Sequence, residues 1–347
     1  MTVRHAFSFR FALCLAALWL LMPSARAMVI NIVAGPNLQS NAGALAAFDR
    51  AATAWETLFT NPITITIDAD LSSNFPSNNI IGSTDAVTLQ ASYNAIESVL
   101  AGDVASQPGG SIAADLPNAS QLSVELPTGF TLSPDMAATK ADLKAMGFTG
   151  LDNQFGAADA TITFNSNFDF YYGTGTFQSG EIDFQTVAEH EIGHVLGFDS
   201  AVDTVDTDLH NNTTEAIEMM PLDLYRFAAN GLPTSAAAFT SDPRDLLTNS
   251  AADLSDTVNN YAMSTGYYTG DKNQASHWKD DALTGQYIGI MDPTLAPNTV
   301  ESITSADIRA MELIGYDSVA PEPTLWISVA AALGIMVRLR RGARPRA

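Results

Sequence analysis

Two histidines four residues apart constrain this chain more than any other feature. They stand in His190-Glu191-Ile192-Gly193-His194, and residues at this spacing face the same way when the segment is helical. The flanking residues predict that helix over Asp183–Leu196, with Asp183 as its N-cap and Gly197 just past its end. Its apolar residues share one broad face, nearly opposite both histidines: Phe184, Ala188, Ile192, Val195 and Leu196.

This arrangement favours a zinc site. Two imidazoles one turn apart can reach one ion, zinc takes nitrogen ligands at about 2.0–2.1 Å, and a catalytic zinc keeps one position for water. Glu191 projects about 100° around the helix from His190, at the edge of the ligand face. From there its carboxylate can take a proton from that water. We therefore predict His190 and His194 as metal ligands and Glu191 as the general base.

Gly197, three residues after His194, extends the motif to HExxHxxG. This pattern resembles the metzincin zinc metallopeptidases, in which the glycine lets the chain turn back under the metal. The resemblance implies an α+β fold, with a twisted sheet and the active-site helix in an upper part and a methionine turn and a C-terminal helix in a lower part. The chain departs from the common pattern at the third histidine, because Ser200 stands there and Asp199 is one place early.

The third ligand must therefore lie elsewhere, and histidine is scarce. Outside the motif and the N-terminal segment, only His210 and His277 remain. His210 lies in a polar stretch, Thr207–Asn212, which predicts a solvated loop. Ser-His-Trp at 276–278, followed by Met291 within Ile-Met-Asp-Pro, resembles the leishmanolysin-type branch, in which a long insertion precedes the third histidine. That resemblance implies His277 as the third zinc ligand and Met291 as the turn methionine.

Two other interpretations stay open. In a gluzincin-type protease the third ligand is a glutamate on a later helix, and Glu215 and Glu218 follow the motif at suitable distances. In the other interpretation the chain is a non-catalytic surface or matrix protein that has kept a protease-like fold. The intact Glu191 favours the enzyme over this second possibility.

Four aspartates follow the motif helix, at Asp199, Asp203, Asp206 and Asp208. They are candidates for binding Ca²⁺ because carboxylates are its usual ligands, but their spacing matches no EF-hand loop. A solvated acidic loop is the better interpretation of this stretch.

Both ends of the chain have the features of processing segments. Residues 1–27 indicate a secretory signal peptide. Arg4 and Arg10 form a basic start, an apolar run over 11–22 follows, and Ala25-Arg26-Ala27 fits the cleavage rule of signal peptidase. Cys14, the only cysteine, lies in this segment. The mature protein is therefore expected to have no disulfide, no cysteine metal ligand and no thiol nucleophile.

Residues 318–347 resemble the PEP-CTERM sorting tail of exported bacterial proteins. Pro321-Glu322-Pro323 is followed by an apolar stretch over 325–337 and then by five arginines. As a helix the apolar stretch spans roughly 20 Å, short of a hydrocarbon core of about 30 Å, which favours a processed signal over a permanent anchor. The resemblance implies transient retention in the inner membrane, cleavage by an exosortase-type enzyme, and delivery to the cell surface or the medium.

The body between these two ends is strongly acidic. It holds 8 Lys and Arg against 37 Asp and Glu, a net charge near −29. A body of this charge repels nucleic acid and anionic membrane surfaces. We therefore expect no nucleic-acid partner, and a protein or peptide as the substrate.

Periodicity predicts the elements of residues 28–317, which we expect to form the catalytic domain. Helices are predicted at Phe48–Phe59, Ser133–Met146 and Ser302–Tyr316, and strands at Pro62–Asp68 and Ala160–Phe170. Residues 173–180 predict a loop, and the organisation of residues 72–120 stays open. We expect Ala160–Phe170 to be an edge strand that holds an extended substrate, and residues 28 to about 45 are a candidate propeptide.

These features together predict an exported zinc metalloendopeptidase. In the expected reaction Glu191 accepts the proton of the attacking water and later passes it to the leaving amine, while zinc polarises the scissile carbonyl.

Overall fold

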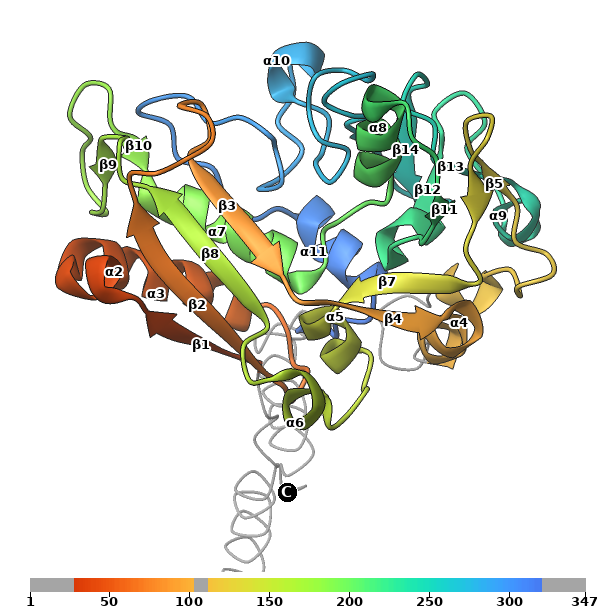
Figure 1. Cartoon of the computed structure of the whole chain (residues 1–347), viewed down its shortest axis with the longest axis horizontal. Helices are drawn as coiled ribbons and strands as arrows, with labels where there is room; N and C mark the ends of the chain where they lie inside the picture. The colour runs from red at the N-terminus through yellow and green to blue at the C-terminus, as the bar shows by residue number, and fades with distance from the viewer. Residues whose placement is uncertain (1–27, 103–111, 320–347) are drawn as a thin grey trace, which may run out of the picture.

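The computed structural model describes residues 28–102 and 112–319 of the 347-residue chain. The signal peptide expected at 1–27 and nearly all of the sorting tail expected at 318–347 lie outside these residues. The described part is a mixed α+β structure, as the sequence predicts, with a twisted sheet on one side and a long irregular region beside it (Figure 1). Within the described ranges, every helix is too short or too polar to cross a membrane.

The central sheet has four strands in the order β1-β2-β8-β3. β1 pairs in parallel with β2, β2 in parallel with β8, and β8 antiparallel with β3. The strands are β1 Val29–Ala34, β2 Thr64–Ser72, β3 Gly82–Ala86 and β8 Ala160–Asn165. The predicted strand at Pro62–Asp68 is thus found, two residues later at its start and longer at its end.

β8 is an interior strand, which corrects the expectation that Ala160–Phe170 forms the substrate-binding edge. It ends at Asn165 and lies between β2 and β3. The edge is β3, in the stretch whose organisation the sequence left open. β3 is short and polar, Gly-Ser-Thr-Asp-Ala, as is usual for edge strands that must not aggregate.

Residues 28–45, the candidate propeptide, are part of the described fold. They hold β1 and the short helix α2 (Pro36–Ser40) and begin helix α3 (Ala42–Glu56). Met28, Ile30, Leu38 and Ala44 are buried.

α3 and the motif helix α7 (Phe184–Leu196) cover one face of the sheet. Phe164 of β8 contacts Phe48 of α3 and Phe184 of α7, with ring centroids 5.3 Å and 4.5 Å away. α3 starts six residues before the predicted Phe48, because Asn41 caps it by accepting a hydrogen bond from the Ala44 N–H. It ends at Glu56, three residues before the predicted end.

The helix predicted over Ser133–Met146 is wrong in its first half. Residues Asp135–Thr139 form strand β7, which pairs antiparallel with β4 (Thr88–Ser92). The helix, α5, covers only Lys140–Ala145 and has Thr139 as its N-cap. Met-Ala-Ala favours a helix by local propensity, but pairing with β4 overrides this weak preference.

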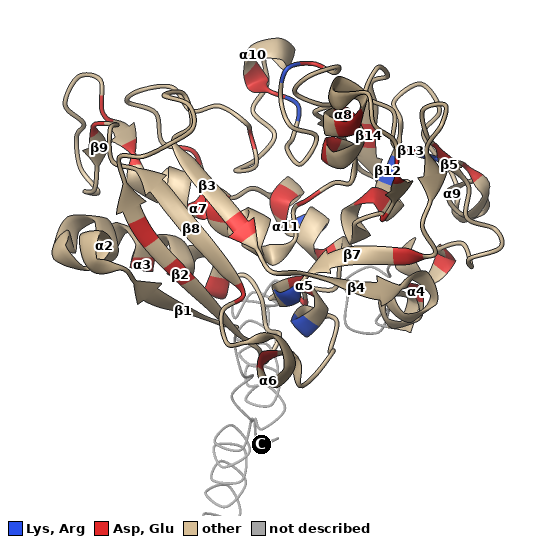
Figure 2. Ribbon diagram, viewed as in Figure 1, with Lys and Arg blue, Asp and Glu red and all other residues tan. Residues whose placement is uncertain are grey.

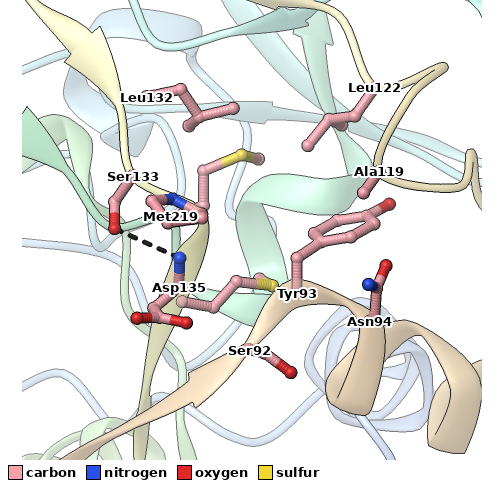
Figure 3. Close-up of a pocket in the computed structure, with 11 residues that line it drawn as sticks. Ser92, Tyr93, Asn94, Ala119, Leu122, Leu132, Ser133, Asp135 and Met219 are labelled. Carbon is pink, nitrogen blue, oxygen red and sulfur yellow. Dashed lines mark hydrogen bonds between the residues drawn. The ribbon is translucent and has the colours of Figure 1, made fainter.

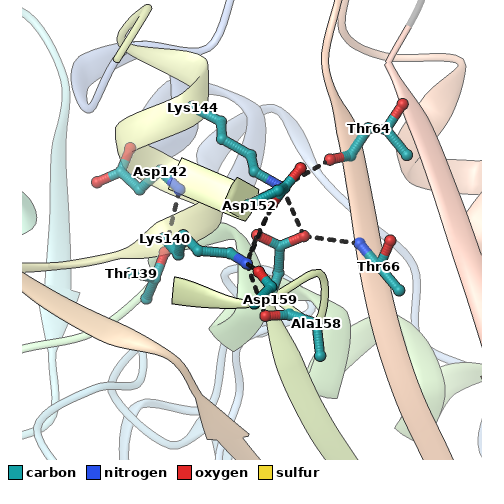
Figure 4. Close-up of polar contacts among 10 residues, drawn as sticks. Thr64, Thr66, Thr139, Lys140, Asp142, Lys144, Asp152, Ala158 and Asp159 are labelled. Atoms are coloured by element: carbon teal, nitrogen blue, oxygen red, sulfur yellow. Dashed lines mark hydrogen bonds and ion pairs between the residues drawn. The ribbon is translucent and has the colours of Figure 1, made fainter. Parts of the chain in front are cut away.

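A small cluster of ion pairs fastens α5 to the sheet (Figure 4). Lys140 and Lys144 both contact Asp152 and Asp159, at distances from 2.7 to 3.4 Å. Lys140 is fully buried and donates to the carbonyls of Gly156 and Ala158. The four charges therefore neutralise one another around the buried Lys140 and Asp159, while Asp152 stays about half exposed.

The region between the motif helix and the C-terminal helix is long and consists mostly of short elements. It begins with helix α8 (Val202–Asn211) and contains an antiparallel sheet of β12, β14 and β15. Its further elements are β11 Ala216–Ile217, η3 Pro221–Tyr225, β12 Arg226–Ala228, α9 Ala236–Ser241, β13 Arg244–Asp245, β14 Ala252–Ser255, β15 Asn260–Met263 and α10 Asp281–Thr284.

The last helix, α11, spans Ser305–Leu313 within the predicted Ser302–Tyr316. Its N-cap is Thr304, one residue before the expected Ser305, and Gly315 adopts a positive φ of 112° just after its end. The remaining short elements are α4 Tyr93–Gly102, η2 Ile112–Asp115, β5 Val124–Glu125, β6 Thr131–Leu132, α6 Leu151–Phe155, β9 Phe170–Tyr171 and β10 Ile182–Asp183. The loop predicted at 173–180 lies between β9 and β10.

Candidate metal centre

The motif helix α7 has the boundaries that its sequence predicts. Asp183 accepts a hydrogen bond from the Thr186 N–H at 3.0 Å and caps the first turn. Gly197 ends the helix with φ = 110°, a conformation that glycine adopts without strain. The predicted apolar face is buried throughout: Phe184, Ala188, Ile192, Val195 and Leu196.

The structure brings His190, His194 and His277 together at one point. The Nε2 atom of His190 lies 3.1 Å from Nε2 of His277 and 3.2 Å from Nε2 of His194. One ligand atom from each of the three residues lies within 4.8 Å of the others. His277 lies 87 residues after His190 in sequence, in the later part of the region between α7 and α11.

Backbone carbonyls hold the other nitrogen of each ring. Nδ1 of His190 lies 2.8 Å from the Ile290 carbonyl, Nδ1 of His194 lies 2.9 Å from that of Phe198, and Nδ1 of His277 lies 3.1 Å from that of Gln274. A carbonyl only accepts, so each Nδ1 must carry the proton and donate it. All three Nε2 atoms are then left with bare lone pairs that face one another.

Three converging lone pairs repel unless a cation lies between them, and the geometry matches such an ion. Two nitrogens bound to zinc at about 2.0–2.1 Å in tetrahedral geometry lie roughly 3.3–3.4 Å apart, close to the 3.1 and 3.2 Å found here. Burial lowers the pKa of His190 to about 3 and of His194 to about 4, and holds the pKa of His277 well below its ordinary value. The rings are therefore neutral near pH 7, and this buried cluster can hold a metal ion.

Glu191 lies under the edge strand β3. The hydroxyl of Thr84 is 2.7 Å from Oε2 of Glu191, and a Cβ at Gly82 would stand only 2.5 Å from Oε1. Burial raises the pKa of Glu191 to about 7, and the Thr84 hydrogen bond opposes part of that rise. A carboxylate with a pKa close to 7 is well matched to taking up and releasing a proton at neutral pH.

Met291 is fully buried beneath the motif helix. Its side chain lies so close to Gly193 that a Cβ at that position would overlap its Sδ atom. The carbonyl of Met291 accepts a hydrogen bond from the Trp278 N–H at 2.9 Å. Met291 therefore links the middle of the motif to the residue directly after His277.

Asp307 of α11 supports the same turn, although the sequence analysis did not single it out. Its carboxylate accepts from Trp278 Nε1 at 2.7 Å and from the Ile290 N–H at 2.9 Å. Ile290 is the residue whose carbonyl holds His190. The chance of finding Asp307 from sequence was small, because it stands at N3 of α11, where an acidic residue commonly completes a capping box.

The other potential third ligands lie elsewhere. His210 is exposed and stacks on Tyr268, with ring centroids 4.1 Å apart, and it belongs to the last turn of α8, where a loop was expected. Glu215 is exposed, and Glu218 accepts a hydrogen bond from Gln90. Among the described residues, the group of potential ligands around the motif contains only the three histidines.

The aspartates after the motif are not a solvated loop, which corrects that expectation. Asp206 is 2% exposed, and Asp199 and Asp203 are half-buried. Asp203 and Asp206 lie on α8 and accept backbone N–H bonds from the segment that leads to His277. An acidic pattern in a sequence gives no sign of such distant donors.

Asp280, Asp281 and Asp292 form a second group of close carboxylates. Asp280 accepts from the Ala282 N–H, and Asp292 accepts from the N–H groups of Asp281 and Thr294. These bonds account for the clustering by themselves, so the group carries no assignment of Ca²⁺.

A pocket of about 400 Å³ lies where β4 and β7 meet helix α4 (Figure 3). Its lining is largely apolar and contains none of the three histidines: Ser92, Tyr93, Asn94, Ala119, Leu122, Leu132, Ser133, Pro134, Asp135, Met136 and Met219. It is therefore separate from the candidate metal centre.

Comparison of this chain with models of protein families, with curated proteins and with solved structures finds no match.

Proposed function

We propose that the protein is an exported zinc-dependent metalloendopeptidase. The observation that carries this proposal is the convergence of three imidazoles: Nε2 of His190 lies 3.1 Å from that of His277 and 3.2 Å from that of His194, on the helix that also carries Glu191. His190, His194 and His277 would hold the ion. A bound zinc ion would supply Lewis acidity, lowering the pKa of a coordinated water toward about 7 and polarising the scissile carbonyl.

Glu191 would carry out the proton transfer, positioned by Thr84. Glu191 takes a proton from the attacking water at its carboxylate and then carries it to the nitrogen of the leaving amine. Thr84 holds the carboxylate in place by the 2.7 Å contact with Oε2. The pKa of about 7 allows Glu191 both to accept and to release the proton near neutral pH.

The edge strand β3 supports an extended peptide as the substrate. In the described sheet β3 pairs with β8 on one side only, so its other side offers backbone N–H and C=O groups for an added strand. Thr84 and Gly82 of this strand lie against Glu191. A peptide paired with β3 would therefore pass beside the general base, and binding through backbone groups suits cleavage within a chain.

We further propose that the fold is of the metzincin type. Three features support this: the glycine turn at Gly197, Met291 beneath the motif, and the closing helix α11. The insertion before His277 suits the leishmanolysin-like branch. The Asp- and Glu-rich surface, on which basic residues gather at few places such as α5 (Figure 2), suits an exported protein that avoids anionic surfaces.

The test is metal content and hydrolysis measured on the same preparation. The purified protein should contain about one zinc per chain and cleave casein, and a chelator should abolish cleavage until zinc is restored. Glu191→Gln should retain zinc, because Glu191 is not a ligand, and lose about 10²–10⁴-fold in activity. Zinc binding without any cleavage would favour the non-catalytic surface protein, and near wild-type activity of Glu191→Gln would contradict the assigned base.

A further inference from the structure

The hydroxyl of Ser276, directly before His277, lies between two aspartates. Its Oγ is 2.6 Å from Oδ1 of Asp199 and 2.5 Å from Oδ2 of Asp203, and it accepts a hydrogen bond from the Ser200 N–H at 3.0 Å. Ser276 is 4% exposed. The hydroxyl donates its one proton to one of the two carboxylates and accepts the Ser200 N–H, so both bonds are made inside the protein.

Asp203 binds the backbone at the same place. Its two oxygens accept the N–H groups of Ala275 and Ser276 at 2.6 and 3.0 Å. Two backbone bonds and one side-chain bond to a single carboxylate fix both the position and the direction of the chain as it enters His277. Asp203 lies in the first turn of α8, a few residues after the glycine that ends the motif helix.

Residues 199–203 therefore stand where the chain leaves the motif helix and also where it returns 76 residues later. Ser200, at the place of the third histidine in the compact metzincin pattern, donates its hydroxyl to Asp223 at 2.6 Å and its N–H to Ser276. In the compact pattern this segment supplies the third ligand. Here residues 199–203 instead form a set of hydrogen bonds, called the seat below, that holds the chain just before His277.

We propose that Ser276 and Asp203 are positioning residues for the third metal ligand, holding His277 so that its Nε2 meets those of His190 and His194. This inference rests on the proposed function, since it assigns a purpose to the seat only if the histidines bind metal. Outer residues that orient a ligand commonly change metal affinity about 10–100-fold when they are replaced.

If the seat only stabilised the fold, a second set of hydrogen bonds between α8 and the same segment should matter for zinc binding in the same way. Asp206, one turn further along α8, accepts the N–H groups of Tyr268 and Thr269 and the Thr269 hydroxyl at 2.6–2.7 Å. This fastening joins the same helix to the same segment but lies eight residues before His277 in sequence. Thr269→Val is therefore a control for Ser276→Ala, because each removes one hydroxyl from a carboxylate of α8, although Thr269 is the more exposed of the two residues.

The experiment uses the full-length protein and its variants, with zinc affinity measured by competition against a chromophoric chelator. Ligand geometry is read from the visible absorption of the Co²⁺-substituted protein, and thermal stability is measured in parallel without metal. Ser276→Ala and the isosteric Asp203→Asn should each weaken zinc binding about 10–100-fold and alter the Co²⁺ spectrum. Thr269→Val should leave zinc affinity and the Co²⁺ spectrum close to wild type, and the melting temperatures measured in parallel show how much stability each variant loses.

Each outcome decides the matter. Unchanged affinity and spectrum in Ser276→Ala would overturn the inference while leaving the metalloprotease proposal intact. An equal loss of affinity in Thr269→Val would also overturn it, because the effect would then belong to folding of the segment. Failure of the wild-type protein to bind zinc would refute the proposed function itself. If Ser276→Ala fails to fold, Asp203→Asn decides in its place.

Discussion

Gly193 lies in the motif at a position that the HExxH pattern leaves free, yet the structure predicts that alanine is unfavourable there. A Cβ at Gly193 would overlap Sδ of Met291 and stand 3.2 Å from its Cε. Met291 is fully buried, and its carbonyl is bonded to Trp278. The side chain itself is flexible, but in a filled core it can move aside only by displacing its neighbours or the turn that carries Ile290, whose carbonyl holds His190.

Two opposing terms set the size of the effect. Replacing an internal helical glycine by alanine stabilises a helix by about 1 kcal/mol. Forcing an extra carbon into a filled core costs about 1–3 kcal/mol. We therefore expect Gly193→Ala to lower the free energy of unfolding by about 0–2 kcal/mol. Removing the obstacle should reverse the sign: in a Met291→Ala background, Gly193→Ala should stabilise by about 1 kcal/mol.

The assay is a double-mutant cycle measured by urea denaturation of the metal-free proteins. Met291→Ala alone should cost about 2–5 kcal/mol, as truncation of buried methionines does. The coupling energy between the two sites should be about 1–3 kcal/mol, the cost of the overlap. Zinc affinity of Gly193→Ala should fall as well, since the displaced turn carries the carbonyl that orients His190.

A gain of about 1 kcal/mol from Gly193→Ala in the wild-type background would refute this reasoning. It would mean that helix propensity alone governs the position and that Met291 does not pack against the motif. An equal effect of Gly193→Ala with and without Met291 would refute it in the same way.

Three further predictions follow from other parts of the molecule. His277→Ala should weaken zinc binding and abolish casein cleavage, whereas His210→Ala should change neither, and equal effects of the two would contradict the assignment of the third ligand. Burial without any hydrogen-bond partner for its carboxylate oxygens raises the pKa of Asp142 well above its ordinary value. The folded state therefore binds the Asp142 proton more tightly than the unfolded state does. The stability that protonated Asp142 contributes at low pH is lost as the pH rises above about 4. Denaturation at pH 4 and pH 8 should therefore show Asp142→Asn gaining on the wild type at the higher pH, and a constant difference would count against this. Intact mass of the secreted protein should show a chain that begins near Met28 and lacks the arginine-rich tail, and a secreted species that retains the tail would argue against the sorting segment.

The motif helix could be predicted in detail because its signals are local. The cap at Asp183, the turn at Gly197 and the buried apolar stripe all depend on residues within one helix. The C-terminal helix was found for the same reason, with its cap only one residue away at Thr304. Signals of this kind survive in any fold that keeps the helix.

The elements that the sequence misplaced depend on partners far along the chain. β7 is a strand because β4, beginning 47 residues earlier, pairs with it over Asp135–Thr139. β3 has too few apolar residues to show an alternating pattern, and its role as the edge follows only from its pairing with β8. For α8, the polar residues around His210 obscured a helix whose buried side is formed by Val202, Val205 and Asp206.

In the candidate site, the side chains themselves could be predicted from the sequence, but the groups that orient them could not. The two motif histidines and Glu191 could be identified from their spacing, and His277 from a resemblance. What orients the imidazoles could not, since the groups are backbone carbonyls of Ile290, Phe198 and Gln274, which every residue type supplies.

The net charge of residues 28–317 and the burial of the candidate site have opposite effects on the pKa of its histidines. A net charge near −29 would by itself raise the pKa of a histidine, yet burial lowers that of His190 to about 3. Desolvation acts on the imidazole directly, whereas exposed carboxylates act through solvent that screens them over about 8 Å at physiological ionic strength. The local effect therefore outweighs the global charge. The site can keep neutral imidazoles that are able to bind a metal ion while the rest of the body stays strongly acidic.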